Sequence, residues 1–183
     1  FAMINKPADE GKVDPKAEML VTVSWPDNNS DDVDTYVEDP AGNVIWYNQR
    51  EGGLMHLDRD DRGMFKDVIL FNGIEVTNPL NQEIISFRGL EDGEYVVNVV
   101  HYIANGTAPL PVTVTVEKLN PSVKVIFYQT LNLAGTGNEQ TAVRFTLKGE
   151  DVIDVNNTPK SLVELTRGGG GKGGSARGGD QGF

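Results

Sequence analysis

The segment MLVTVSW, residues Met19–Trp25, decides the fold because its side chains alternate in character. Its odd-numbered residues are all apolar, whereas Thr22 and Ser24 between them are polar. Successive side chains of a strand point to opposite faces of a sheet, so this period of two predicts a strand with one face in the core and one in water. The segment PVTVTVEKL at residues 111–119 repeats the pattern. Both segments therefore predict antiparallel strands with one solvated face.

Other strands are predicted by segments rich in β-branched and aromatic residues. These are QEIISF at 82–87, EYVVNVVHYI at 94–103, SVKVIFYQTL at 122–131 and TAVRFTL at 141–147. Turn sequences such as PAGN and FNG separate the predicted strands, and no long segment has the 3.6-residue period of an amphipathic helix. The expected fold is all-β, a two-sheet antiparallel sandwich of about eight or nine strands, with a closed barrel as the alternative.

Composition divides the chain into three parts. Residues 17–166 hold the predicted strands and form the sandwich domain. Residues 1–16 are a linker rich in charge, proline and glycine; its apolar start, FAMI, is typical of a chain that has lost a signal or anchor segment, with a natural mature end as the alternative. Residues 167–183, RGGGGKGGSARGGDQGF, form a glycine-rich tail that we expect to be flexible.

The charge and the reactive residues exclude several classes of function. The formal net charge of −11 repels phosphate backbones and anionic lipids, so nucleic acid is excluded as a partner and a membrane is reached only through a missing N-terminal anchor. The chain has no cysteine, which excludes disulfides, thiolate zinc sites and cysteine nucleophiles. No serine lies in a Gly-x-Ser-x-Gly turn, and the glycine run before Lys172 lacks the Ser or Thr of a phosphate loop. We therefore expect a protein that is not an enzyme.

The stretch WPDNNSDDVDTYVEDPAGNVIW, residues 25–46, contains five aspartates and raises the question of a metal site. Read as a twelve-residue calcium loop from Asp27, it has oxygen ligands at positions one, three, five and twelve. Position six, where such a loop needs glycine for its sharp turn, is Asp32, and the flanking segments are predicted strands rather than helices. The stretch is therefore not an EF-hand.

Two interpretations of the acidic residues remain. In the first, a loop end of the sandwich binds Ca²⁺, the one candidate cofactor, through Asp27, Asp31, Asp32, Asp34 and Asp58. In the second, Asp27 and Asn28 close a turn after Pro26, and Asp31 and Asp32 cap the next strand from solvent. Asp58 then lies on an exposed loop, the long connection GGLMHLDRDDRGMFK at 52–66, where charges of both signs pair with one another. His56 and His101 lie among apolar residues, so we expect packed, hydrogen-bonded histidines rather than metal ligands.

Three segments carry a resemblance to a family. DDVDTYVEDPAGNVIWY at 31–47 resembles the Asp-Val-Asp-Leu-x-Val-x-x-Pro-x-Gly signature of bacterial and phage extracytoplasmic β-sandwich modules, which are similar in plan to pre-peptidase C-terminal domains. GLEDGEYVVNVVHY at 89–102 resembles their Gly-x-Tyr-x-Val-x-Val strand, and GGLMHLDRDDRG at 52–63 their Gly-Gly-x-Leu-x-x-Asp run. The resemblance covers residues 17–118 and implies a sandwich for adhesion, assembly or presentation, in some cases with calcium. Its aspartates match Asp32, Asp34 and Asp58.

Two functions from different classes follow as expectations. The first is a non-catalytic binding or presentation module outside the cytoplasm, in the periplasm, on the cell surface or on a virion. Its acidic loop end and the neighbourhood of Trp25 and Trp46 would contact a protein or glycan surface. The alternative is a structural protein of an assembly, a virion surface or filament subunit, in which copies of the chain contact one another.

Overall fold

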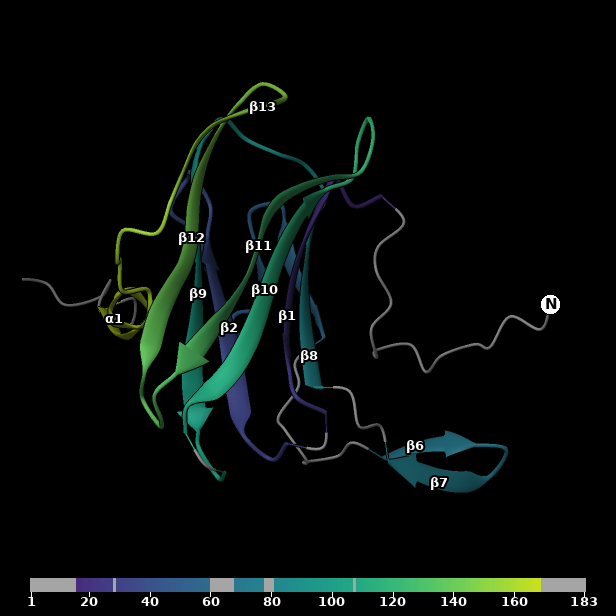
Figure 1. Ribbon diagram of the computed structural model, residues 1–183. Helices are drawn as coiled ribbons and strands as arrows, with labels where there is room; N and C mark the ends of the chain where they lie inside the picture. Colours follow the sequence, from purple (N-terminus) through teal and green to yellow (C-terminus); the bar gives the residue numbers. More distant parts are fainter. Residues whose placement is uncertain (1–15, 28, 60–67, 78–80, 107, 169–183) are drawn as a thin grey trace, which may run out of the picture.

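The computed structural model describes residues 16–27, 29–59, 68–77, 81–106 and 108–168 (Figure 1). A six-stranded sheet contains β1 (Met19–Trp25), β4 (Glu51–Gly52), β5 (Met55–Arg59), β8 (Asn81–Phe87), β10 (Leu110–Lys118) and β11 (Lys124–Leu133). A five-stranded sheet contains β2 (Asp32–Glu38), β3 (Val44–Ile45), β9 (Gly93–Ile103), β12 (Glu139–Lys148) and β13 (Asp151–Asn156). The remaining elements are a separate two-stranded hairpin and one short helix: β6 (Val68–Phe71), β7 (Ile74–Thr77) and α1 (Val163–Gly168).

The two larger sheets face each other as the layers of a sandwich (Figure 1). Their strand orders are β11-β10-β1-β8-β5-β4 and β13-β12-β9-β2-β3, and neighbouring strands are antiparallel. The sheets do not close into a barrel, so the prediction of an all-β, two-sheet antiparallel sandwich is confirmed. Among the described residues, no helix is long and apolar enough to cross a membrane.

The core explains the alternation that predicted the fold. Strand β1 lies between β8 and β10, and Val21 is opposite both Ile85 and Val116. These side chains are buried, and the five-stranded sheet meets them with residues such as Val97 and Phe145 in the same cluster. Each fully buried side chain of this size stabilises the fold by about 1.5–3 kcal/mol relative to exposure. The inward face predicted for Met19–Trp25 is therefore confirmed, and Trp25 belongs to the core.

The structure differs from the sequence prediction in two connections. Residues 52–66 were expected as one long loop, but β5 begins within them at Met55, and its Met55 and Leu57 side chains are buried against the core. Helix α1 was not predicted, and it takes in Arg167 and Gly168 from the segment expected as a flexible tail. In each case a buried apolar side chain, Leu57 in β5 and Leu162 just before α1, helps to hold the segment in place.

Candidate functional site

Asp31 is a fully buried structural residue. Its Oδ2 lies 2.8 Å from Nε2 of His101, and its Oδ1 accepts hydrogen bonds of 2.7 Å from the backbone N–H groups of Asn105 and Gly106. Its carbonyl accepts the indole N–H of Trp25 at 3.1 Å. Burial opposes the charged carboxylate, but these hydrogen bonds and His101 together lower the pKa of Asp31 below its ordinary value. The prediction that Asp31 caps a strand from solvent is therefore wrong, whereas the packed, hydrogen-bonded His101 is confirmed.

The other candidate metal ligands are spread over both sheets. Asp27 is exposed just after β1. Asp32 and Asp34 lie on β2 and are mostly buried, so Asp32 does not cap this strand from solvent. Asp58 lies on β5 in the other sheet, where its largely buried Oδ1 is 3.5 Å from Nε2 of His56; the expected exposed loop position of Asp58 is wrong.

No described group of three or more His, Cys, Asp or Glu residues is arranged to hold a metal ion. Both oxygens of Asp31 are already hydrogen-bonded, so a metal ligated by this carboxylate would displace one of those bonds. The calcium site therefore stays a prediction.

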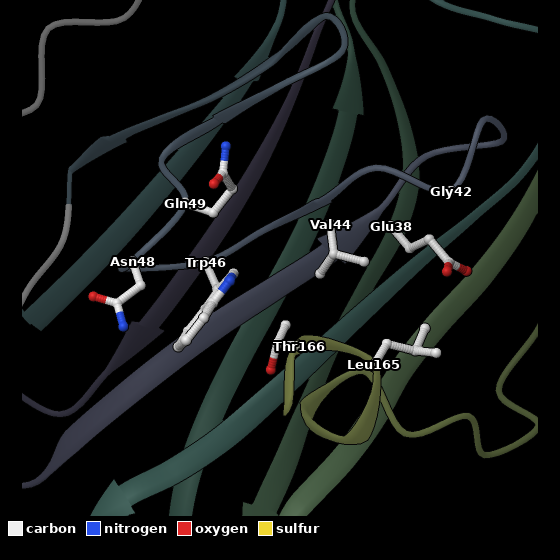
Figure 2. A pocket seen from close by; sticks show the side chains of 8 residues that line it. All are labelled: Glu38, Gly42, Val44, Trp46, Asn48, Gln49, Leu165 and Thr166. Atoms are coloured by element: carbon white, nitrogen blue, oxygen red, sulfur yellow. The ribbon is translucent and has the colours of Figure 1, made fainter. Parts of the chain in front are cut away.

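A groove of about 460 Å³ is lined by residues of α1 and of the chain around β3 (Figure 2), and α1 lies on the face of the five-stranded sheet that is turned away from the other sheet (Figure 1). One wall comes from the end of β2 and the chain that follows it through β3, and α1 forms the other (Figure 2). The lining residues are Glu38, Gly42, Val44, Trp46, Asn48, Gln49, Leu165 and Thr166. Its size falls in the range of about 300–1,000 Å³ that small-molecule sites occupy in proteins.

The first wall is fixed by a turn built around Asp39. The two carboxylate oxygens of this buried residue accept hydrogen bonds of 2.8 Å from the backbone N–H and the side-chain amide of Asn43. Gly42 completes the turn with φ of 88°, a conformation that favours glycine. Gly53 packs over the same bonds, because a Cβ atom there would lie 2.4 Å from Oδ2 of Asp39. The sequences EDPAGN and EGG thus set the path of β3 toward the groove.

Trp46 is held in the groove by other aromatic rings. The ring of Tyr36 stacks on it, with centroids 5.4 Å apart and planes inclined by 17°. Tyr47 packs edge-on against Trp46 at 4.8 Å and continues to Tyr102, which is about half exposed. Paired backbone hydrogen bonds between Trp46 and Gln49 form a tight two-residue turn. Burial, followed by the charge of Asp34, raises the pKa of Tyr36, so this ring stays a neutral support for Trp46.

The second wall is fastened by the carboxylate of Glu139 on β12. Its oxygens accept hydrogen bonds from the hydroxyl of Ser161 at 2.6 Å, from the N–H groups of Leu162 and Val163 at 2.9 and 3.1 Å, and from the side chain of Asn98 at 2.8 Å. Although burial opposes its charge, these donors lower the pKa of Glu139 below its ordinary value. Leu162 is fully buried in the cluster that includes Tyr36. Residues 157–168, which we call the C-terminal strap, are therefore fixed to the outer face of the sheet.

The groove is close to electrically neutral. Glu38 is the one ionisable side chain among the lining residues that the structure describes, and its Oε1 forms an ion pair with Nζ of Lys160 in the strap. The indole N–H of Trp46 and the amide of Asn48 make no hydrogen bond within the described part of the chain, and neither is a buried unsatisfied group. The groove therefore offers an aromatic ring and accessible hydrogen-bonding groups beside a neutralised carboxylate.

The sequence predicted only part of the groove. Of the two tryptophans expected near a contact surface, Trp46 lines the groove, whereas Trp25 is buried in the core. The strap was missed, although Ser161 and Glu164 have the spacing of a helix capping box and the Ser161 hydroxyl accepts the Glu164 N–H at 3.3 Å. Comparisons of the chain with protein-family models, with curated proteins and with solved structures found no match.

Proposed function

We propose that the chain is a non-catalytic binding module that acts outside the cytoplasm and takes a neutral saccharide in the groove beside Trp46. The single observation that carries the proposal is the Trp46 ring, fixed by Tyr36 from behind and set in a groove with accessible amide groups. The C–H face of a sugar ring packs on an aromatic ring, and its hydroxyls both donate and accept hydrogen bonds, as an amide does.

The charges of the groove favour a neutral ligand over a cationic one. An aromatic site for a cation gains from unpaired carboxylates close to the ring. Among the described residues that line this groove, the only carboxylate is that of Glu38, and it already has Lys160 as its partner. A cationic ligand would compete with that lysine, whereas a neutral sugar can hydrogen-bond to Glu38 without separating the pair.

The same lining supports binding rather than catalysis. Glycoside hydrolysis uses two carboxyl groups on either side of the scissile bond, about 5–10 Å apart. The part of the lining that the structure describes supplies one carboxylate, and that one is held in an ion pair. Outside the groove, His101 is engaged with Asp31, and His56 lies between Glu51 and Asp58. This arrangement supports a site that binds a sugar without hydrolysing it.

Binding of the full chain to a panel of neutral mono- and oligosaccharides, followed by isothermal titration of the panel members that bind, tests the proposal. We expect Trp46→Ala to weaken binding at least tenfold, about 1.4 kcal/mol. Asn48→Ala, which removes a side chain with no hydrogen bond among the described residues, should weaken binding about 3- to 10-fold without changing stability. Asn157→Ala, an exposed amide outside the groove, is the matched control.

Two results would count against the saccharide groove. One is the absence of binding by any panel member up to about 10 mM, the weak limit of specific recognition. The other is binding that both Trp46→Ala and Asn48→Ala leave unchanged, because the saccharide would then lie elsewhere on the chain.

A further inference from the structure

A row of three aromatic rings leads out of the groove. Tyr47 packs on Trp46 with ring centroids 4.8 Å apart, and Tyr102 packs on Tyr47 with centroids 5.9 Å apart. Trp46 lines the groove, Tyr47 is half-buried, and Tyr102 near the end of β9 is 48% exposed and lies outside the described lining. We call these three residues the aromatic row. It connects the groove to a ring that is open to solvent.

Tyr102 is aimed by a β-bulge in β9. In the pairing of β9 with β2, two consecutive residues of β2 lie opposite His101 and Ile103, so Tyr102 between them is the extra residue. An extra residue of this kind re-aims a side chain, and bulges are frequent next to binding and active sites. The backbone beside it is fixed, because the N–H of His101 donates to the carbonyl of Asn138 and its carbonyl accepts the N–H of Gly137. The exposed ring is therefore held in place before any ligand binds.

The aromatic row has the dimensions of a sugar chain. Each step between neighbouring ring centroids, 4.8 and 5.9 Å, is comparable with the length of one sugar residue in a glycan. The planes of neighbouring rings are inclined by 78° and 54°, which suits a chain whose successive residues turn relative to one another. Burial, followed by the neighbouring Tyr102 and Asp34, raises the pKa of Tyr47, so its hydroxyl stays protonated and can donate to a sugar oxygen.

We propose that the ligand is a neutral oligosaccharide of at least three residues, with one residue on Trp46 in the groove and its chain running past Tyr47 to Tyr102. The inference rests on the proposed function, because the Trp46 groove holds one end of the chain. Rigid aromatic side chains lose little conformational freedom on binding, and a second contact made by the same ligand does not repeat the cost of association. Tyr102 is therefore a specificity-determining residue that selects for chain length, whereas a monosaccharide fills the groove alone.

Isothermal titration of the full chain with a length series of the panel sugar that binds, from the monosaccharide to the pentasaccharide, tests the inference. We expect the trisaccharide to bind at least tenfold more tightly than the monosaccharide. Tyr102→Ala should weaken trisaccharide binding about 5- to 10-fold and leave the monosaccharide within about twofold of the wild type. Tyr102→Phe keeps the ring and its contact with Tyr47, so it should retain most of the gain. The matched control is Tyr128→Ala, at an exposed tyrosine on β11 of the other sheet, which should change neither affinity.

The outcomes separate the inference from the proposed function. Equal affinity for the monosaccharide and the trisaccharide, equal weakening of both by Tyr102→Ala, or a matching loss in Tyr128→Ala would overturn the aromatic row as a binding path. The groove would still stand in those cases if Trp46→Ala weakened monosaccharide binding. A series in which no member binds would overturn both.

Discussion

Removal of the Asp31 carboxylate should reveal how much of the fold depends on one buried contact. In Asp31→Ala, His101 and the backbone N–H groups of Asn105 and Gly106 lose their acceptor. Each donor or acceptor left unsatisfied in a buried position costs about 1–3 kcal/mol, and His101 is fully buried. Because the two loop N–H groups are partly reached by water, we expect a total loss of about 3–5 kcal/mol in the free energy of unfolding.

Urea unfolding at pH 7, followed by tryptophan fluorescence, measures this loss. For a chain of this length each kcal/mol lowers the melting temperature by about 2–4 °C, so Asp31→Ala should melt roughly 6–20 °C below the wild type. Asp31→Asn keeps an oxygen for the two loop N–H groups and should lose only about 1–1.5 kcal/mol. The matched control is Asp27→Ala, at an exposed aspartate in the same loop, which should stay within about 0.5 kcal/mol of the wild type.

The pH dependence adds a second readout for Asp31. Its pKa is lowered in the folded chain, so its charged form stabilises the fold above the unfolded pKa of about 3.9 and this contribution is lost as the pH falls through the folded value. The stability difference between wild type and Asp31→Asn should therefore shrink as the pH falls below about 4. If Asp31→Ala unfolded within about 1 kcal/mol of the wild type, Asp31 would not be fastening its loop to β9.

Two further predictions concern the glycines at the Asp39 turn and the calcium site. Gly53→Ala should lower the free energy of unfolding in urea by about 2–4 kcal/mol, because φ is +56° and the new Cβ would lie 2.4 Å from Oδ2 of Asp39. Gly42→Ala is the control: φ is +88° but the space around it is open, so backbone strain should lower the free energy of unfolding by only about 1–2 kcal/mol. Equal losses in the two variants would show that the Asp39 contact is unimportant. Addition of about 5 mM CaCl₂ should leave the melting temperature within about 1 °C, because the Asp31 oxygens are already engaged; a rise of several degrees that Asp34→Asn abolishes would instead support the calcium site.

The fold could be predicted from the sequence because strand alternation is a local property. The apolar face of Met19–Trp25 needs a core whichever strands lie beside it, so periodicity alone identified the strand and its buried side. The role of Asp31 could not be predicted in this way. His101 is 70 residues away along the chain and meets Asp31 only because β2 pairs with β9 in one particular register. The sequence around Asp31 therefore gives no sign of His101, the partner beside which Asp31 is buried.

The groove illustrates the same limit with two residues of one type. Trp25 and Trp46 both follow strand-like segments, yet the inward register of β1 buries the first, and the turn at residues 46–49 leaves the second in the groove. The strap was more accessible to prediction, because its Ser161–Glu164 capping pair is a local signal. Its position over the sheet was not, because the Glu139 carboxylate that receives it lies on another strand.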